Sequence, residues 1–170
     1  DGHVARANHR LYPMRRNIIV AWSVHDISVH GLTKRQASPT SLQGMVTKTQ
    51  PLGATPEPLN PMALAVAMDA GFVARGFTGD SEQLVDLMQQ AIRHRGLALL
   101  DIFQPCVVFN KINTLQWYRE RCYRIGDDHD PTDREAARRL ELACPDWRPP
   151  WGIYRTGRTR QQARTGGSAG

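Results

Sequence analysis

The sequence predicts an α/β domain in which a parallel sheet carries helices on both faces. Apolar stretches of strand length occur at residues 17–24, 72–75 and 97–103, and helical patterns stand between them. This order of strand, loop and helix, strand, helix, strand is that of βαβ units with right-handed crossovers. A chain of 170 residues is long enough for one domain with a sizeable core.

The first elements are a helix, a strand and a long loop. We expect a helix over residues 8–16, although Pro13 would break or kink it. Residues 18–22 form a continuous apolar, β-branched run, which is typical of a strand covered on both faces. Residues 31–58 are rich in Gly, Pro, Thr, Ser and Gln without periodicity, and a loop of that length usually has a function or a partner.

Two helices are predicted on either side of the second strand. Asn60 and Pro61 mark the start of a helix that continues to Ala70 and ends at Gly71. The next helix covers residues 81–94 and is stopped by Gly96. We expect its buried stripe to consist of Leu84, Val85, Leu87, Met88, Ala91 and Ile92.

Two more helices follow the third strand, each with a capping box at its start. Asn113 with Gln116 predicts a helix that runs to about residue 123. Thr132 with Glu135 predicts another over residues 133–143. An irregular C-terminal segment begins at residues 145–151, and we place the end of the domain at residue 154.

The charge and the apolar pattern limit the function classes. Most of the net charge of +6 comes from arginines in residues 155–170, which contain no acid and are expected to form a disordered tail. A basic tail can bind nucleic acid, but the few aromatic residues and the absence of a reading module argue against it. Neither a membrane span nor a signal peptide is evident, so we expect a cytoplasmic protein.

Residues 26–41 are the stretch around which the chain is organised, because they leave the first strand at its carboxyl end. In open α/β sheets ligands bind at that end of the strands. Gly31 permits a close backbone approach, Thr33 offers a hydroxyl, and Lys34 and Arg35 offer positive charge. An anion-binding loop and an ordinary polar surface loop both account for this composition.

Several separated blocks resemble the beta subunit of 2-oxoacid:ferredoxin oxidoreductases. They are Gly31-Leu32-Thr33-Lys34, Gln36, Ser38-Pro39-Thr40, Thr47-Lys48-Thr49, Phe72-Val73-Ala74-Arg75-Gly76, Pro105-Cys106, Phe109-Asn110, Asn113-Thr114 and His129-Asp130-Pro131. The blocks are collinear with the family from about residue 8 to residue 155. The resemblance implies the C-terminal part of a thiamine diphosphate-binding domain, over residues 1–154.

The resemblance also implies a Mg²⁺ site that holds the cofactor's diphosphate. Asp1 and Gly2 match the end of the family's Gly-Asp-Gly motif, and Val29 matches the residue whose backbone carbonyl binds the metal. Ile27 stands where the family has a metal-binding Asn, and it offers no side-chain oxygen. Asp26 is the alternative donor, but it needs a local shift, since neighbouring residues of an extended chain point to opposite sides.

Four residues of the loop carry implied contacts to the cofactor and the substrate. Gly31, Leu32 and Thr33 are expected to contact the diphosphate or the thiazolium ring. Lys34 is expected to act in catalysis by meeting the substrate carboxylate or coenzyme A, and a solvated loop lysine is the alternative.

Cys106 matches the family's iron–sulfur ligand in the C-terminal half, and the alternative is a small packed residue. The other ligands of the [4Fe–4S] cluster belong to an N-terminal Cys-x-x-Cys segment that this sequence does not contain, so we expect a fragment of a longer subunit. Cys122 and Cys144 fall on predicted helices and are interpreted as packing residues.

The family reaction is the oxidative decarboxylation of a 2-oxoacid, such as pyruvate or 2-oxoglutarate, to an acyl-CoA, with electrons passed to ferredoxin. The active site is completed by an alpha subunit, so the resemblance implies a heterodimer. Because Ile27 replaces a metal ligand, a second hypothesis remains open. In that hypothesis the chain is a remnant that keeps the fold and the subunit interface but neither binds the cofactor nor catalyses.

Overall fold

The computed structural model describes residues 20–29, 36–55, 57–126, 129–142, 150–151 and 153–155. The helix expected over residues 8–16, Cys144 and all of the expected tail except Arg155 lie outside these residues. The predicted boundary after residue 154 therefore stays a prediction.

The main sheet has the strand order β1-β3-β2-β6 within the described residues. β1 (Val20–Asp26) and β2 (Phe72–Phe77) both pair in parallel with β3 (Leu97–Phe103), which confirms the predicted parallel sheet for these strands. The C-terminal segment was expected to be irregular, and this is wrong for two stretches. β6 (Ile153–Arg155) pairs antiparallel with β2, and β5 (Pro150–Trp151) pairs with β4 (Tyr123–Arg124).

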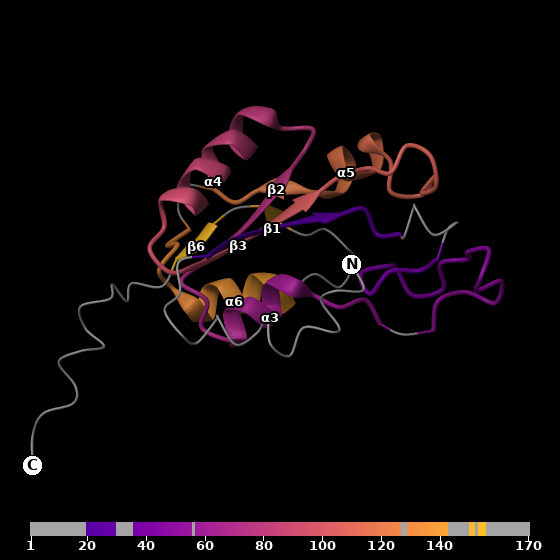
Figure 1. Ribbon diagram of the computed structural model, residues 1–170, viewed down its shortest axis with the longest axis horizontal. Coiled ribbons are helices and arrows are strands. Elements are labelled where there is room, and N and C mark those ends of the chain that lie inside the picture. The colour runs from indigo at the N-terminus through magenta and orange to yellow at the C-terminus, as the bar shows by residue number, and fades with distance from the viewer. Residues whose placement is uncertain are drawn as a thin grey trace, which may run out of the picture.

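Helices cover both faces of the sheet, as predicted (Figure 1). α4 (Ser81–Arg93) lies on one face, where Leu87 and Ala91 pack against side chains of β2 and β3. α3 (Pro61–Ala67) and α6 (Arg134–Leu142) lie on the other, where they pack against further side chains of the same strands. None of the described helices is long and apolar enough to cross a membrane.

β1 is less enclosed than its sequence suggests. Every residue of β2 and β3 is buried, whereas the side chains of Ala21, Ser23 and His25 in β1 are exposed. Within the described residues, the prediction that both faces of this strand are buried is therefore wrong for one face. These side chains lie in register with Ala98, Leu100 and Ile102, on the face of the sheet that α4 covers. The described core cluster on that face contains side chains of β2, β3 and α4 and none of β1.

Helix α3 starts where predicted and ends earlier. The Asn60 side chain accepts hydrogen bonds from the backbone N–H groups of Met62 and Ala63, at 3.1 and 3.0 Å. The end is not at Gly71, because Asp69 adopts a left-handed conformation with φ 63°. The N–H of Ala70 then reaches the carbonyl of Ala65 at 3.0 Å, which closes a Schellman motif.

Both helices with a predicted capping box are instead capped by the residue that follows the predicted cap, and neither Trp117 nor Ala136, at the third helical position, can complete a box. Helix α5 (Leu115–Arg121) is capped by Thr114, whose hydroxyl accepts from the N–H of Trp117 at 3.2 Å. Asn113 does not serve as the cap, because its amide belongs to a buried network described below. At α6 the carboxylate of Asp133 accepts from the N–H of Ala136 at 2.9 Å, while Thr132 bonds to Asp130.

The buried stripe of α4 is narrower than predicted. Leu87 and Ala91 are buried, and Leu84 and Met88 are partly buried against the same core cluster. Val85 and Ile92 point away from the sheet and are 53% and 72% exposed. The sequence prediction was wrong for these two residues because apolarity alone does not define which side of a helix meets the sheet.

Candidate functional site

The candidate site lies where β1 and β3 end side by side. Asp26, the last residue of β1, is opposite Phe103, the last residue of β3. The N–H of Gln104 donates to the carbonyl of Asp26 at 3.0 Å, so the two loops that follow start from a common point. This is the edge of the sheet at which α/β proteins bind ligands.

The turn from Asp26 to Val29 is organised by one carboxylate oxygen. Oδ1 of Asp26 accepts from the backbone N–H of Ser28 at 2.9 Å and from the hydroxyl of Thr40 at 2.7 Å. Ser28 has φ 53°, a left-handed conformation that is uncommon for a residue with a side chain. Asp26 is 4% exposed, so its hydrogen bonds both balance its burial and hold the turn in this shape.

The segment from Ser38 to Ser41 folds over this turn. The hydroxyl of Ser41 donates to the carbonyl of Ser28 at 2.6 Å and accepts from the N–H of Ser38 at 2.7 Å. Together with Thr40 these contacts join two segments that lie 13 or 14 residues apart in the chain. The Ser-Pro-Thr-Ser sequence therefore acts as a hydroxyl-rich brace for the turn after β1.

The loop after β3 wraps its backbone around the sulfur of Cys106. The N–H of Phe109 donates to Sγ at 3.4 Å. Burial alone would raise the pKa of the Cys106 thiol, but the backbone N–H groups of residues 108–110, with the charge of Lys111, hold that pKa below its ordinary value. The loop thus favours the thiolate, which is the form in which cysteine binds metals.

Asn110 joins the cysteine loop to the turn after β1. Its Oδ1 accepts from the N–H groups of Ile112 and Asn113, both at 3.0 Å. Its Nδ2 donates to Oδ1 of Asn113 at 2.8 Å and to the carbonyl of Ile27 at 3.4 Å. Asn110 and Asn113 are 2% and 1% exposed, so this amide network is fully inside the molecule.

The four backbone carbonyls of the turn differ in the hydrogen bonds that they accept. Those of Asp26, Ile27 and Ser28 accept from Gln104, Asn110 and Ser41. Among the described residues, none donates a hydrogen bond to the carbonyl of Val29. The turn thus commits three of its carbonyls to other described residues of the protein.

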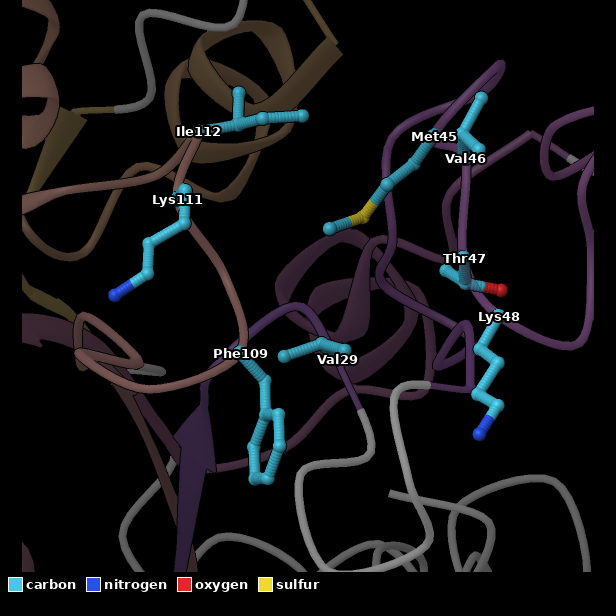
Figure 2. Close-up of a pocket in the computed structure, with 8 residues that line it drawn as sticks. All are labelled: Val29, Met45, Val46, Thr47, Lys48, Phe109, Lys111 and Ile112. Atoms are coloured by element: carbon cyan, nitrogen blue, oxygen red, sulfur yellow. The ribbon is translucent and has the colours of Figure 1, made fainter.

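A cavity of about 490 Å³ lies next to this turn (Figure 2). Its apolar lining comes from Val29, Met45, Val46, Phe109 and Ile112. Thr47, Lys48 and Lys111 supply its polar lining. The cavity therefore has one wall from the turn, one from residues 45–48 and one from the cysteine loop.

A buried ion network lies behind the site, and no sequence motif predicted it. Nε of Arg75 is 2.9 Å from Oδ2 of Asp101, and Nη1 is 3.0 Å from Oε2 of Glu141 in α6. Burial raises the pKa of Asp101 to about 6, against the opposing attraction of Arg75. Burial disfavours the Arg75 cation, but Glu141 and Asp101 outweigh it and raise its pKa. The sequence contained one sign of this network, because each of two otherwise apolar strands has an ionisable residue in its interior.

The predicted site residues fall into two groups. Asp26, Ile27 and Val29 lie together in the turn after β1, and Cys106 lies in the neighbouring loop, held to the turn through Asn110. The rest, whose predicted roles stay predictions, lie outside the described residues. They are Asp1, Gly2, Gly31, Leu32, Thr33 and Lys34.

The described residues fit a Mg²⁺ site only in part. The carbonyl of Val29 is an oxygen donor of the kind that Mg²⁺ binds. Ile27 supplies no side-chain oxygen, and Oδ1 of Asp26 already serves Ser28 and Thr40. Among the described residues, no three His, Cys, Asp or Glu side chains are grouped closely enough to hold a metal ion.

Two family models match the chain. The model of the thiamine pyrophosphate enzyme C-terminal TPP binding domain matches residues 6–102. The model of the C-terminal part of the pyruvate ferredoxin oxidoreductase beta subunit matches residues 106–166. The first match contains the turn after β1, and the second begins at Cys106.

Curated relatives carry matching names. The 2-oxoacid:ferredoxin oxidoreductase subunit beta from Sulfolobus sp is 43% identical over 127 residues, which are 74% of this chain and 42% of the relative. Subunit beta of 2-oxoacid:ferredoxin oxidoreductase 1 from Aeropyrum pernix is 36% identical over 150 residues, or 82% of this chain and 47% of the relative. The chain spans less than half the length of these relatives.

A solved structure has the same fold. It is a 2-oxoglutarate:ferredoxin oxidoreductase from Magnetococcus marinus, with 2-oxoglutarate, coenzyme A and succinyl-CoA bound. The match has a TM-score of 0.86 and 33% sequence identity, and it covers 99% of this chain and 60% of that chain.

Proposed function

Since the chain belongs to the thiamine pyrophosphate enzymes and, among them, to the beta-subunit family of 2-oxoacid:ferredoxin oxidoreductases, we propose that it is part of a cofactor-binding subunit. The resemblance noted in the sequence is confirmed by these matches. The proposed reaction is the oxidative decarboxylation of a 2-oxoacid to an acyl-CoA, with ferredoxin as electron acceptor and an alpha subunit as partner.

The observation that carries this proposal is the set of hydrogen bonds in the turn from Asp26 to Val29. Its first three carbonyls are held by the protein, and the carbonyl of Val29 is the one that the family uses for Mg²⁺. When bound, thiamine diphosphate supplies the electron sink for decarboxylation. Thr40, Ser41 and Asn110 hold the turn rigid through their hydrogen bonds. A rigid turn keeps the diphosphate of the bound cofactor in one orientation.

The residues outside the described ranges complete the proposal. Gly31, Leu32 and Thr33 contact the diphosphate or thiazolium side of the cofactor, and Asp1 binds the metal beside Gly2. Lys34 meets the substrate carboxylate or coenzyme A. These roles rest on the family resemblance alone.

Cys106 is proposed as one ligand of a [4Fe–4S] cluster. The backbone donors around its sulfur support this role, because they favour the thiolate. The remaining ligands come from outside this sequence. A cytoplasmic location is part of the same proposal, since the cytosol keeps thiols such as those of Cys106 and Cys122 reduced.

Ile27 favours a second candidate, a non-catalytic remnant that keeps the fold and the subunit interface. The residue at the position of the expected metal-binding Asn has no oxygen in its side chain. The nearest carboxylate, Asp26, holds the turn together.

Isothermal titration of thiamine diphosphate into the full chain, with Mg²⁺ and with EDTA, separates the two candidates. The cofactor-binding proposal expects affinity at least tenfold higher with Mg²⁺. If wild type shows no Mg²⁺-dependent binding and Ile27→Asn restores it, the remnant hypothesis is correct. Ile92→Asn is the matched control, because Ile92 is exposed on α4, away from the site.

A further inference from the structure

Tyr118, a buried residue of α5, packs at the edge of the sheet that carries the candidate site. Its side chain is 1% exposed. Its ring is stacked on that of Phe103, with 5.1 Å between centroids, and lies 5.5 Å from that of Phe77. Phe103 and Phe77 are the last residues of β3 and β2, so Tyr118 lies at the end of the strands where the turn after β1 begins.

The position of this ring is set by its own helix. The N–H of Tyr118 donates to the carbonyl of Thr114, the capping residue of α5, at 3.1 Å. The carbonyl of Tyr118 accepts from the N–H of Cys122 at 2.8 Å. Trp117 meets the ring edge-on, with 5.1 Å between centroids. Backbone bonds and ring contacts therefore hold Tyr118 in place together.

The hydroxyl of Tyr118 reaches the turn after β1, where it hydrogen-bonds to the side chain of Ser28. The hydroxyl of Ser28 donates in turn to Oδ1 of Asp26 at 3.4 Å. Because a serine hydroxyl has a single proton, Tyr118 is the donor to Ser28. Burial, and after it the charge of Asp26, raise the pKa of Tyr118, so the phenol keeps its proton and remains a donor.

Ser28 is a strained residue that depends on its hydrogen bonds. Its φ of 53° is left-handed, which costs energy because the Cβ of an L-residue then crowds the following carbonyl. Its N–H donates to Asp26 at 2.9 Å, and its carbonyl accepts from Ser41 at 2.6 Å. With the bond from Tyr118, the backbone and the side chain of Ser28 are both held in this conformation.

Packing alone does not account for the hydroxyl of Tyr118. A phenylalanine would stack on Phe103 and Phe77 in the same way and would bury no polar group. A buried hydroxyl costs free energy unless it is hydrogen-bonded, and here the bond goes to the strained residue of the turn. The contact therefore points to a role in the shape of the turn, beyond that of an aromatic core residue.

We propose that Tyr118 is a positioning residue of the candidate site. Its hydroxyl, acting through Ser28, holds the turn after β1 in the left-handed conformation that directs the carbonyl of the next residue, Val29. The inference deepens the proposed function and rests on it for the use of that carbonyl by the cofactor's metal. It adds α5, which bears none of the predicted site residues, to the segments that shape the site.

Hydrogen exchange of the full chain, followed by NMR, tests the proposal with Tyr118→Phe, which removes the hydroxyl and keeps the ring. The N–H of Ser28 is bonded to Asp26 and reports opening of the turn. We expect its exchange to become about three- to tenfold faster, as the loss of one hydrogen bond implies. Tyr123→Phe removes an exposed phenol hydroxyl on β4 and should leave the exchange of Ser28 unchanged.

A second control separates the turn from the stability of the whole fold. Asn60→Ala removes the cap of α3, away from the turn, and makes global unfolding easier. It should leave the exchange of Ser28 unchanged, because an amide in a surface turn exchanges through local opening.

Titration of thiamine diphosphate with Mg²⁺ follows the consequence for the site. We expect the affinity to fall about three- to tenfold in Tyr118→Phe. Ser28→Ala should lower it as well, and Tyr118→Phe should have no further effect in the Ser28→Ala background, because the two residues act through one bond.

Four results would overturn the inference. They are unchanged exchange of Ser28 in Tyr118→Phe, equal acceleration in Asn60→Ala, losses of affinity that add in the double variant, and faster exchange with unchanged cofactor affinity. A wild type that does not bind the cofactor would count against the proposed function instead. The exchange of Ser28 in the two variants would then decide the role of Tyr118 by itself.

Discussion

The side-chain amide of Asn110 donates a hydrogen bond to the backbone carbonyl of Ile27, at 3.4 Å, across 83 residues of sequence. It links the loop that bears Cys106 to the turn that ends in Val29. In the proposed enzyme the Cys106 loop binds the iron–sulfur cluster and the turn that ends in Val29 binds the cofactor. The buried amide of Asn110 therefore fixes the position of one site relative to the other.

Asn110→Ala should loosen both loops. Loss of its buried hydrogen bonds should lower the free energy of unfolding by about 1–3 kcal/mol, measured by urea denaturation. The N–H groups around Cys106 should lose their alignment, so the pKa of its thiol should rise. Iodoacetamide alkylation near neutral pH should then slow.

The matched control for Asn110→Ala is Asn60→Ala. Asn60 caps α3 and bonds to Glu141, so its loss should also destabilise the fold, by about 1 kcal/mol. It lies away from the cysteine loop and should leave alkylation of Cys106 unchanged. Equal effects of the two variants on alkylation would mean that Asn110 acts only through global stability.

Thr40→Val tests whether Asp26 is an anchor or a metal donor. The substitution removes the hydroxyl that donates to Oδ1 of Asp26 at 2.7 Å and keeps the side-chain shape. We expect unfolding to become easier by about 1–3 kcal/mol and Mg²⁺-dependent cofactor affinity to fall. A rise in that affinity would instead show that the freed carboxylate serves as the substitute ligand.

The chain offers a matched control for Thr40→Val. The hydroxyl of Thr132 also donates to an aspartate, Asp130, at 2.7 Å, but in an exposed turn. Thr132→Val should change the free energy of unfolding by less than about 0.5 kcal/mol. It should leave cofactor affinity unchanged.

The sequence predicted those parts of the fold that depend on local pattern. The parallel strands and the Asn60 cap followed from apolar runs and from residue types with strong backbone preferences. The predicted caps at Asn113 and Thr132 were wrong because each has a neighbour that can also cap. Local hydrogen bonds decided between them, since Asn110 donates to the side-chain amide oxygen of Asn113 and the hydroxyl of Thr132 donates to Asp130.

The sequence predicted only those residues of the candidate site that belong to a family motif. Asp26, Val29 and Cys106 were singled out through their motif positions at strand ends, and their roles stay predictions. The bracing role of Asn110 and the pairing of Arg75 with Asp101 were missed because those bonds join residues 83 and 26 positions apart. No periodicity connects such pairs, and a single sequence contains no record of their contact.

Arg75→Met should strongly destabilise the chain. Arg75 is buried between Asp101 and Glu141, with side-chain exposures of 6%, 0% and 8%. Removing the cation leaves two buried carboxylates unpaired, a loss of about 3–5 kcal/mol measurable by urea denaturation. Arg121→Met breaks the exposed pair with Glu120 and should cost less than about 1 kcal/mol. Similar losses in both variants would contradict a special role for the buried network.

Asp101 should make the stability of the chain depend on pH in an unusual direction. Burial raises its pKa to about 6, from an ordinary value of 3.8, so between these values the folded chain binds a proton that the unfolded chain does not. The stabilisation linked to this proton is complete below about pH 4 and is lost as the pH rises through 6. Asp101→Asn removes the titrating group, so the unfolding free energy of wild type minus that of the variant should fall from pH 4 to pH 6 and be flat above. Other titrating groups are common to both proteins and cancel in the difference. A difference that rises with pH would mean that Arg75, and not burial, dominates the pKa of Asp101.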